Sequence, residues 1–229
     1  MSDQKPTNHF GEDHAASYDE RFVKLAPFKD AIHLCMRALL ADLPDDARIL
    51  CVGAGTGAEV LYLAEAFPGW TFTLVEPSAP MLNRCRMRAA EAGIEARCTF
   101  HEGYLDNLPH THPFDAATSI LVSQFVLVRQ KRCNFFQDIA ARLKPGGHLI
   151  TADLAGEPGT VNYEAWMALM KYNDVDDEKI AQYRESLANH VAIEPPGEVE
   201  AIIAEGGFDT PVLACQTLLI HTWHARRTG

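Results

Sequence analysis

The sequence predicts an α/β protein with a mainly parallel, Rossmann-like sheet and helices on both of its faces. Short apolar runs alternate with helix-length amphipathic segments over residues 48–153, which is the pattern of consecutive strand–helix–strand units. The first apolar run enters a turn with three spaced glycines within residues 49–57, and a second run, 72–75, ends in Glu76. A strand, a glycine turn, a helix and an acid at the tip of the next strand are typical of a nucleoside-binding unit.

Hydrophobic periodicity and turn residues place the elements of the first two thirds of the chain. Helices are expected at 14–22 and 27–43, at 58–67, after the capping residue Ser78, and at 132–143. Strands are expected at 48–52, 71–75, 97–101, 114–121 and 148–153. The Lys-Pro-Gly-Gly segment at 144–147 should end the helix before the fifth strand.

The last third of the chain departs from this alternation. Residues 159–190 predict two successive helices, 161–172 and 176–189, with no strand between them. A further helix is expected at 197–204, and the β-rich segment 211–225 has room for two strands.

The glycine turn predicts a ligand that the backbone approaches closely. Glycine permits that approach, and the helix N-terminus presents unpaired N–H groups. Glu76 can accept hydrogen bonds from both hydroxyls of a ribose. Residues 53–58 also satisfy the dinucleotide pattern G-x-G-x-x-G/A, so the turn alone leaves nicotinamide dinucleotide and S-adenosylmethionine (SAM) both open.

Composition excludes several other classes of function. With 229 residues and 47% hydrophobic content, one globular domain is the simplest expectation. A net charge of −11 argues against a broad nucleic-acid surface. No apolar run is long enough to cross a membrane, and residues 1–11 lack the apolar core of a signal peptide. The six cysteines are widely spaced and are expected to be buried free thiols, which predicts a cytoplasmic location and no metal site.

Residues 49–153, together with the C-terminal β segment, resemble the class I SAM-dependent methyltransferases. The resemblance is carried by the 49–57 glycine motif, Glu76-Pro77-Ser78 with Met81-Leu82, Phe114-Asp115, the 143–147 segment and Gly206-Gly207-Phe208. It implies a seven-stranded sheet whose last strand is antiparallel, with a helical insert after strand five. It also implies SAM as cofactor and S-adenosylhomocysteine (SAH) as product.

The resemblance further implies a domain plan and a cofactor site. One domain would span 1–229, with N-terminal helices or a lid over 1–43, a SAM-binding core over 44–155, a helical substrate cap over 156–192, and a C-terminal helix and β hairpin over 193–229. The residues expected to contact the cofactor are Gly53, Ala54, Gly55, Gly57, Glu76, Pro77, Met81, Tyr104, Leu105, Ile120 and Leu121. Methyl transfer needs alignment more than a catalytic base, so no catalytic residue is predicted.

A small-molecule acceptor is expected beneath the helical insert. The residues proposed to contact it are Tyr18, Trp166, Lys171 and Arg184. The two basic residues suit an anionic acceptor, although surface pairing with nearby acids such as Asp174–Glu178 or Glu185 is the commoner fate of such residues. No membrane partner is expected, and a homodimer is left open.

Three alternatives remain at this point. Tyr18-Asp19, residues 81–86 and Ser123-Gln124-Phe125 look like the carboxy-SAM synthase that serves wobble-uridine modification of tRNA. A non-catalytic SAM-binding protein is suggested because Cys51 and Tyr104 stand at two positions where the family usually has an acid. A nicotinamide oxidoreductase comes last, because a second mononucleotide-binding half is hard to fit after residue 155.

Overall fold

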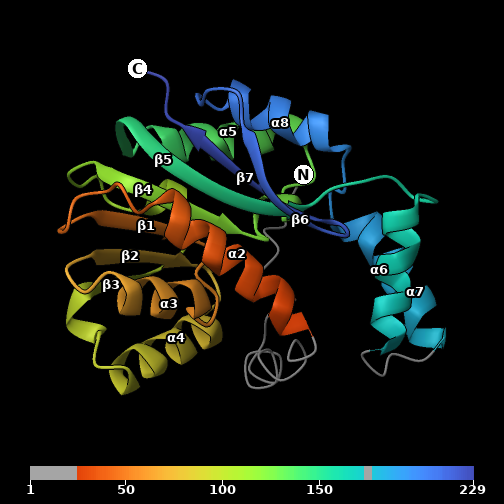
Figure 1. The fold of residues 1–229 in the computed structure, drawn as a ribbon, viewed down its shortest axis with the longest axis horizontal. Coiled ribbons are helices and arrows are strands. Elements are labelled where there is room, and N and C mark those ends of the chain that lie inside the picture. Colours follow the sequence, from red (N-terminus) through yellow and green to blue (C-terminus); the bar gives the residue numbers. More distant parts are fainter. Residues whose placement is uncertain (1–24, 173–176) are drawn as a thin grey trace. The chain divides into compact units, whose positions relative to one another are not determined.

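The computed structural model describes residues 25–172 and 177–229, and Figure 1 shows their fold. The predicted fold class is confirmed. A seven-stranded sheet has the order β3-β2-β1-β4-β5-β7-β6, and β7 runs antiparallel to β5 and to β6. The chain divides into two compact units, one ending at Thr118 and one beginning at Ser119, and each is described by itself. The prediction of a single domain remains a prediction.

The first unit contains the parallel strands of the nucleoside-binding pattern. Its elements are α2 (Ala26–Leu39), β1 (Arg48–Val52), α3 (Ala58–Ala66), β2 (Thr71–Glu76), α4 (Ala79–Glu91), η3 (Glu95–Arg97), β3 (Cys98–Glu102), η4 (Leu105–Asn107) and most of β4 (Phe114–Ile120). β1 pairs in parallel with β2 and with β4, and β2 pairs in parallel with β3. The predicted helix at 14–22 lies outside the described residues.

One helix boundary of the first unit differs from the prediction and another agrees with it. The helix predicted at 27–43 ends at Leu39, four residues earlier than predicted. Ser78 caps α4 as predicted, with its hydroxyl accepting from the Met81 N–H at 3.4 Å.

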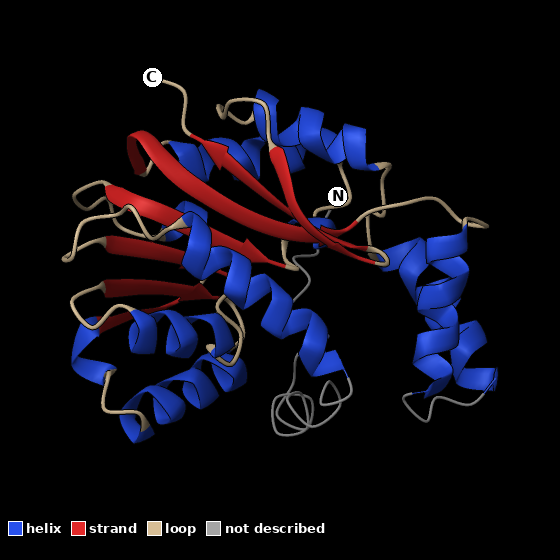
Figure 2. Ribbon diagram, viewed as in Figure 1, coloured by secondary structure: helices blue, strands red, loops and turns tan. Residues whose placement is uncertain are grey.

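The core of this unit explains the continuous apolar strands. Ile49, Leu50 and Cys51 of β1 are fully buried, as expected for a parallel strand covered on both faces. α3 packs against α2 and α4, and α4 also packs against β2 and β3; Figure 2 shows α3 and α4 together beside the red strands of this unit.

The second unit holds the antiparallel part of the sheet and the helical insert. Its elements are η5 (Ser123–Phe125), α5 (Arg129–Ala140), β5 (Leu143–Leu154), α6 (Val161–Tyr172), α7 (Asp177–His190), α8 (Pro196–Glu205), β6 (Val212–Thr217) and β7 (Ile220–Arg226). α5 packs against α8, and α6 packs against α7. The helical insert after strand five and the C-terminal hairpin were both predicted.

Two boundaries in this unit were predicted wrongly. α5 occupies 129–140, not 132–143, and β5 begins at Leu143, so the Lys-Pro-Gly-Gly segment belongs to the strand. Strand β5 begins early because its first residues pair with a residue that follows β7. The Gly146 N–H donates to the Arg227 carbonyl at 3.0 Å and the Arg227 N–H donates to the Gly147 carbonyl at 2.8 Å, which extends the β5 ladder through the two glycines.

Surface and thiol chemistry were partly as expected. All six cysteines are free, but only Cys51, Cys85 and Cys133 are buried, so the expectation of uniformly buried thiols was wrong.

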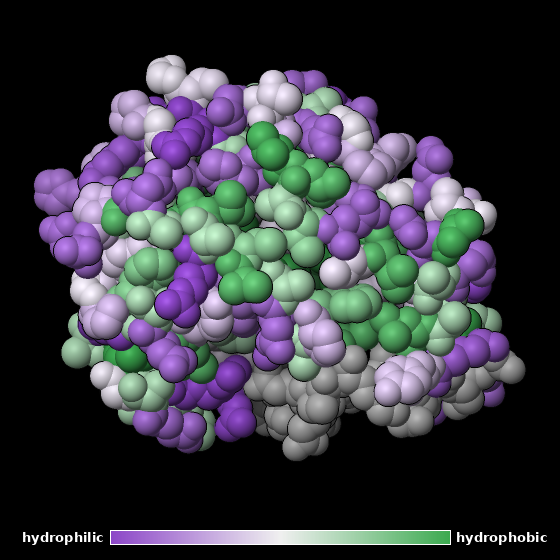
Figure 3. All heavy atoms as spheres, in the orientation of Figure 1, coloured by the Kyte–Doolittle hydropathy of each residue, from purple (hydrophilic) through white to green (hydrophobic). Residues whose placement is uncertain are grey.

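Figure 3 shows apolar side chains exposed among polar ones on the viewed face. The large exposed apolar residues are Leu34, Met87, Leu127, Val128, Val161, Tyr172, Val212 and Leu213. Within the described ranges, no helix has the length and apolarity to cross a bilayer, and no group of three metal-binding side chains is clustered.

Candidate functional site

The turn between β1 and α3 is built from three glycines in left-handed conformations. Gly53, Gly55 and Gly57 have φ values of 74°, 54° and 79°, a region that side chains disfavour. The N–H groups of Gly53 and Ala54 both donate to the Val75 carbonyl, at 2.8 and 3.1 Å. The turn is therefore anchored to the end of β2 before any ligand is considered.

Glu76 strengthens that anchor. One carboxylate oxygen accepts from the Gly55 N–H and the other from the Ser78 N–H, each at 2.9 Å. Burial raises the pKa of Glu76, and these two backbone hydrogen bonds oppose that rise. A carboxylate has about four acceptor positions, so Glu76 can hold the turn and still accept from a ribose hydroxyl. Its structural role was not foreseen from the sequence.

Gly55 and Gly57 serve different purposes. A Cβ at Gly57 would lie 2.5 Å from the Cys85 sulfur, so this glycine lets α4 pack closely. Among the described residues, a Cβ at Gly55 would meet only the Met81 Cε, at 3.7 Å. The part of the chain that the structure describes therefore leaves space in front of Gly55, beside the predicted contact residue Met81. An open glycine cradle flanked by a carboxylate fits the ribose and methionine parts of SAM.

The end of β3 adds an aromatic residue to this region. The Gly103 N–H donates to the Glu76 carbonyl at 3.1 Å, which brings Tyr104 next to the end of β2. The pKa of the Tyr104 phenol is raised by burial and then by the negative charges of Glu76 and Asp106. Leu105 is buried at the start of η4. An aromatic ring here suits stacking on an adenine.

Most of the predicted cofactor residues thus gather at one place in the first unit. They are Gly53, Ala54, Gly55, Gly57, Glu76, half-buried Pro77, Met81, Tyr104 and Leu105. These residues gather at the carboxyl ends of β1, β2 and β3, which is the edge at which parallel α/β sheets bind ligands. Their contact with a cofactor stays a prediction.

Glu59, a buried acid behind the turn, was not among the predicted site residues. Glu59 lies in the first turn of α3 and is only 8% exposed. Burial raises its pKa from 4.5 to about 7; the neighbouring charge of Glu76 adds to the rise and Arg88 opposes it. Burial and the Glu59 charge also raise the pKa of the Cys51 thiol. A carboxyl group is therefore present beside Cys51, supplied by the following helix, and the only sequence signal for it was an acid in a helix's first turn.

The two remaining cofactor candidates, Ile120 and Leu121, are described with the second unit. Ile120 ends β4, and Leu121 has a left-handed φ of 59°. The strand predicted to continue through Leu121 therefore stops one residue earlier. Their proposed role also stays a prediction.

The predicted acceptor residues have specific surroundings in the helical insert. Trp166 is buried, and its indole N–H donates to the Tyr183 hydroxyl at 3.0 Å. Arg184 pairs with Glu164 at 3.0 Å and lies over the Tyr163 ring, 5.5 Å from its centroid. The pairing of Arg184 thus joins α7 to α6, through an acid that the sequence analysis had not named.

The other two acceptor candidates add less. Lys171 is exposed in the last turn of α6, and Tyr18 lies outside the described residues. The roles of all four acceptor candidates stay predictions.

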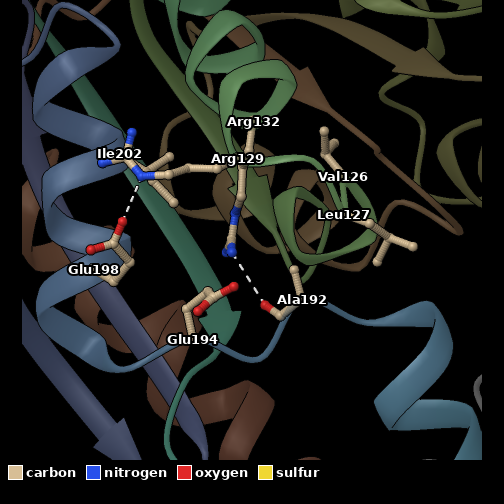
Figure 4. A pocket seen from close by; sticks show the side chains of 8 residues that line it. All are labelled: Val126, Leu127, Arg129, Arg132, Ala192, Glu194, Glu198 and Ile202. Carbon is tan, nitrogen blue, oxygen red and sulfur yellow. Dashed lines mark hydrogen bonds and ion pairs between the residues drawn. The ribbon is translucent and has the colours of Figure 1, made fainter.

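A cavity of about 150 Å³ in the second unit was not anticipated. Figure 4 shows its lining residues, which are Val126, Leu127, Arg129, Arg132, Ala192, Glu194, Glu198 and Ile202. Arg129 pairs with Glu198 at 2.5 Å and with Glu205 at 2.7 Å, and its hydrogen bond lowers the pKa of Glu205 to about 2. Arg132 pairs with buried Asp153. Both cations of the cavity therefore already pair with acidic side chains of the chain.

Comparison with known proteins agrees with this geometry. Residues 49–147 match the family model described as "Methyltransferase domain". The chain is 28% identical over 127 residues to the malonyl-[acyl-carrier protein] O-methyltransferase of Magnetococcus marinus, covering 56% of this chain and 45% of that protein. It is 32% identical over 107 residues to the fatty-acid O-methyltransferase of Mycolicibacterium smegmatis, covering 46% of this chain and 36% of that one.

A solved structure extends the likeness over almost the whole chain. A putative O-methyltransferase from Nostoc punctiforme superposes with a TM-score of 0.68 at 14% identity, covering 93% of this chain and 59% of the other. Identity this low shows the fold alone. The chain spans less than half the length of the two curated relatives.

The matched region, the strand order and the glycine turn agree with one another. Residues 49–147 match a methyltransferase domain, and the strand order and glycine turn are those that the resemblance to the class I SAM-dependent methyltransferases implied. The carboxy-SAM synthase and the non-catalytic SAM-binding protein stay predictions.

Proposed function

We propose that this protein binds SAM and transfers its methyl group to an oxygen atom of a small-molecule acceptor. The observation that carries this proposal is the contact between Glu76 and the Gly55 N–H, which fixes a left-handed glycine turn beside a strand-end carboxylate. The methyltransferase-domain match over the same residues supports SAM over a nicotinamide dinucleotide.

The residues of this turn explain how the chain would hold its cofactor. When bound, SAM would supply an electrophilic methyl group on a sulfonium and leave as neutral SAH. Glu76 would accept from the ribose hydroxyls, and Gly55 would let the backbone approach without a side chain in the way. Tyr104 would pack on the adenine. The protein's task is then to align donor and acceptor and to exclude water.

A carboxylate is the acceptor class that needs least from the chain. The carboxylate oxygen is already ionised at neutral pH, so its methylation requires no catalytic base. The sequence likewise predicted no catalytic residue. The two curated relatives are named as O-methyltransferases of a fatty acid and of a malonyl-carrier protein, which supports this choice. Lys171 and Arg184 are the proposed cationic partners of the carboxylate. The cytoplasmic location predicted from the free thiols is part of the proposal.

A two-stage experiment tests the function. Calorimetric titration with SAM, SAH and NAD should show binding of the first two and none of the third. SAH release should then be measured over a panel of short-chain fatty acids, aromatic carboxylates and phenols. Binding of NAD in place of SAM would overturn the cofactor assignment. Normal SAM binding with no SAH release from any member would overturn the small-molecule acceptor.

A further inference from the structure

A second strand-end carboxylate lies in the other unit and has different partners. Asp153, near the end of β5, is fully buried. The Ser123 hydroxyl donates to it at 2.6 Å and the Gln124 N–H donates to it at 2.9 Å. Arg132 Nη2 lies 3.3 Å from one of its oxygens. Every group in this network is at least 95% buried, so each contact acts in a medium of low polarity.

Arg132 and Gln124 extend this network to two further segments. Arg132 donates from Nε to the Ser123 hydroxyl at 2.9 Å and from Nη1 to the Ala192 carbonyl at 3.2 Å; Figure 4 shows the guanidinium reaching Ala192. The Gln124 side-chain oxygen accepts from the Leu154 N–H at 2.7 Å, and its carbonyl accepts from the Ala192 N–H at 2.7 Å. Gln124 therefore joins η5, the end of β5 and the segment that follows α7.

The same contacts close the base of the helical insert. The insert leaves β5 at Gly156 and its chain returns at Ala192. Ala155 forms a parallel β-bridge with Glu194, and the Gly156 N–H donates to the Glu194 carbonyl at 2.9 Å. The two ends of the α6–α7 insert are thus tied to each other, and through Gln124 to η5.

The turn before η5 is held in an unfavourable conformation. Leu121 has a φ of 59° and its N–H donates to the Ala152 carbonyl at 2.6 Å. A branched residue reaches this region only at a cost, and such conformations persist where the surroundings determine them and cluster at functional sites. The network of Ser123, Gln124 and Asp153 begins two residues later, so it is placed to maintain the turn.

We propose that Gln124 and Arg132 are positioning residues that hold the Leu121–Phe125 turn and the base of the α6–α7 insert as one rigid element for acceptor binding. This inference rests on the proposed function, in which the insert contributes the acceptor contacts. It makes acceptor affinity depend on the network, whereas cofactor affinity depends on the glycine turn of the first unit.

The first test replaces Gln124 with methionine, which keeps the length of the side chain and removes the acceptor of the Leu154 N–H. We expect Gln124→Met to raise the acceptor KM about tenfold, the effect of one lost hydrogen bond, with kcat and the SAM Kd each within about twofold of wild type. The acceptor is the panel member with the fastest SAH release. Gln130→Met is the matched control, because Gln130 makes its hydrogen bond to Asn134 on the exposed face of α5, and it should change nothing.

Hydrogen exchange supplies a readout that does not depend on turnover. In Gln124→Met, the amides of residues 154–156 and 192 should exchange faster, and those of residues 53–57 should not. Faster exchange with an unchanged acceptor KM would show that the network is only structural and would overturn the inference. A parallel loss of SAM affinity would also overturn it. If wild-type protein binds no SAM, the proposed function fails first, so the two failures are distinguishable.

A second pair of variants tests the strained turn without removing a buried polar group. Leu121→Gly can adopt the observed φ freely, so it should fold and yet raise the acceptor KM by loosening the turn. Leu218→Gly is the control, since Leu218 has a similar φ of 55° in the β6–β7 hairpin, and it should leave KM unchanged. Equal KM values for Leu121→Gly and wild type would contradict the inference.

Discussion

Glu76 in the first unit and Asp153 in the second are acids at or next to the carboxyl end of a strand, and both are buried. Glu76 is held by two backbone N–H groups, one from a glycine that leaves open space beside it. Asp153 is held mainly by side chains from η5 and α5, including a guanidinium. Backbone donors occupy little volume, so the first carboxylate keeps acceptor positions for the proposed ribose contact, whereas side chains surround the second. We therefore propose that an acidic residue at a similar strand position serves binding in one unit and rigidity in the other.

The largest effect is expected from removing the cation of the second site. Arg132→Met leaves the buried Asp153 carboxylate unpaired, so it should lower the free energy of unfolding by about 3–5 kcal/mol. Urea denaturation measures this change. Arg129→Met is the control, because its ion pairs are solvent-exposed and should contribute much less to stability. Similar losses in the two variants would contradict the distinction between buried and exposed pairs.

The buried acid behind the glycine turn should make stability depend on pH. Between pH 4.5 and about 7 the folded protein keeps Glu59 protonated while the unfolded chain ionises it. The stability from this group is therefore fully present below pH 4.5 and is lost as pH rises through about 7, by roughly 3 kcal/mol at most. Thermal or urea unfolding of wild type and Glu59→Gln from pH 4.5 to 8 measures it, and the variant should lack this component. Parallel pH profiles would disprove it.

Cofactor binding should depend on Glu76 by a smaller amount. Glu76→Gln removes a charge-assisted acceptor and should weaken SAM binding by about 1.5–3 kcal/mol in calorimetry. Glu102→Gln is the matched control, because Glu102 is the exposed partner of Glu76 in the β2–β3 register. Unchanged SAM affinity in Glu76→Gln would remove the basis of the cofactor assignment.

Substitutions at Gly55 and Gly57 should have different effects on SAM binding and on stability. Gly55→Ala places a side chain at a φ of 54° and should cost about 1–2 kcal/mol of stability, together with a marked loss of SAM affinity. Gly57→Ala should lose more stability than Gly55→Ala, since its Cβ would lie 2.5 Å from the Cys85 sulfur. Circular dichroism on heating and SAM titration of both variants decide the matter. A Gly55→Ala variant that binds SAM normally would show that this glycine is only structural.

The smallest stability effects are expected at the exposed cations of the insert. Lys171→Ala and Arg184→Ala should each change the free energy of unfolding by less than about 1 kcal/mol. If these residues bind a carboxylate, the acceptor KM should rise for carboxylates and stay constant for phenols. Wild-type KM values for both acceptor classes in both variants would rule out this contact.

The features that were predicted well depend on neighbours in the sequence. Ser78 caps a helix three residues from the N–H it binds, and the glycine turn follows its strand directly. The start of strand β5 was misplaced because it depends on a distant partner, the pairing of Gly146 with Arg227. Local propensity cannot report such pairing, because the partner lies far along the chain.

The sequence by itself determined the α/β class, the glycine turn, the acid at the end of β2 and the helical insert. Each is encoded by residue type at short spacing, through backbone freedom, hydrophobic period or capping. Only the tertiary structure decided that Glu76 anchors the turn, that Glu59 is buried beside Cys51, and that Arg132 neutralises Asp153. These facts depend on burial and on contacts between remote segments, which set the energy of a charge far more than its place in the sequence does.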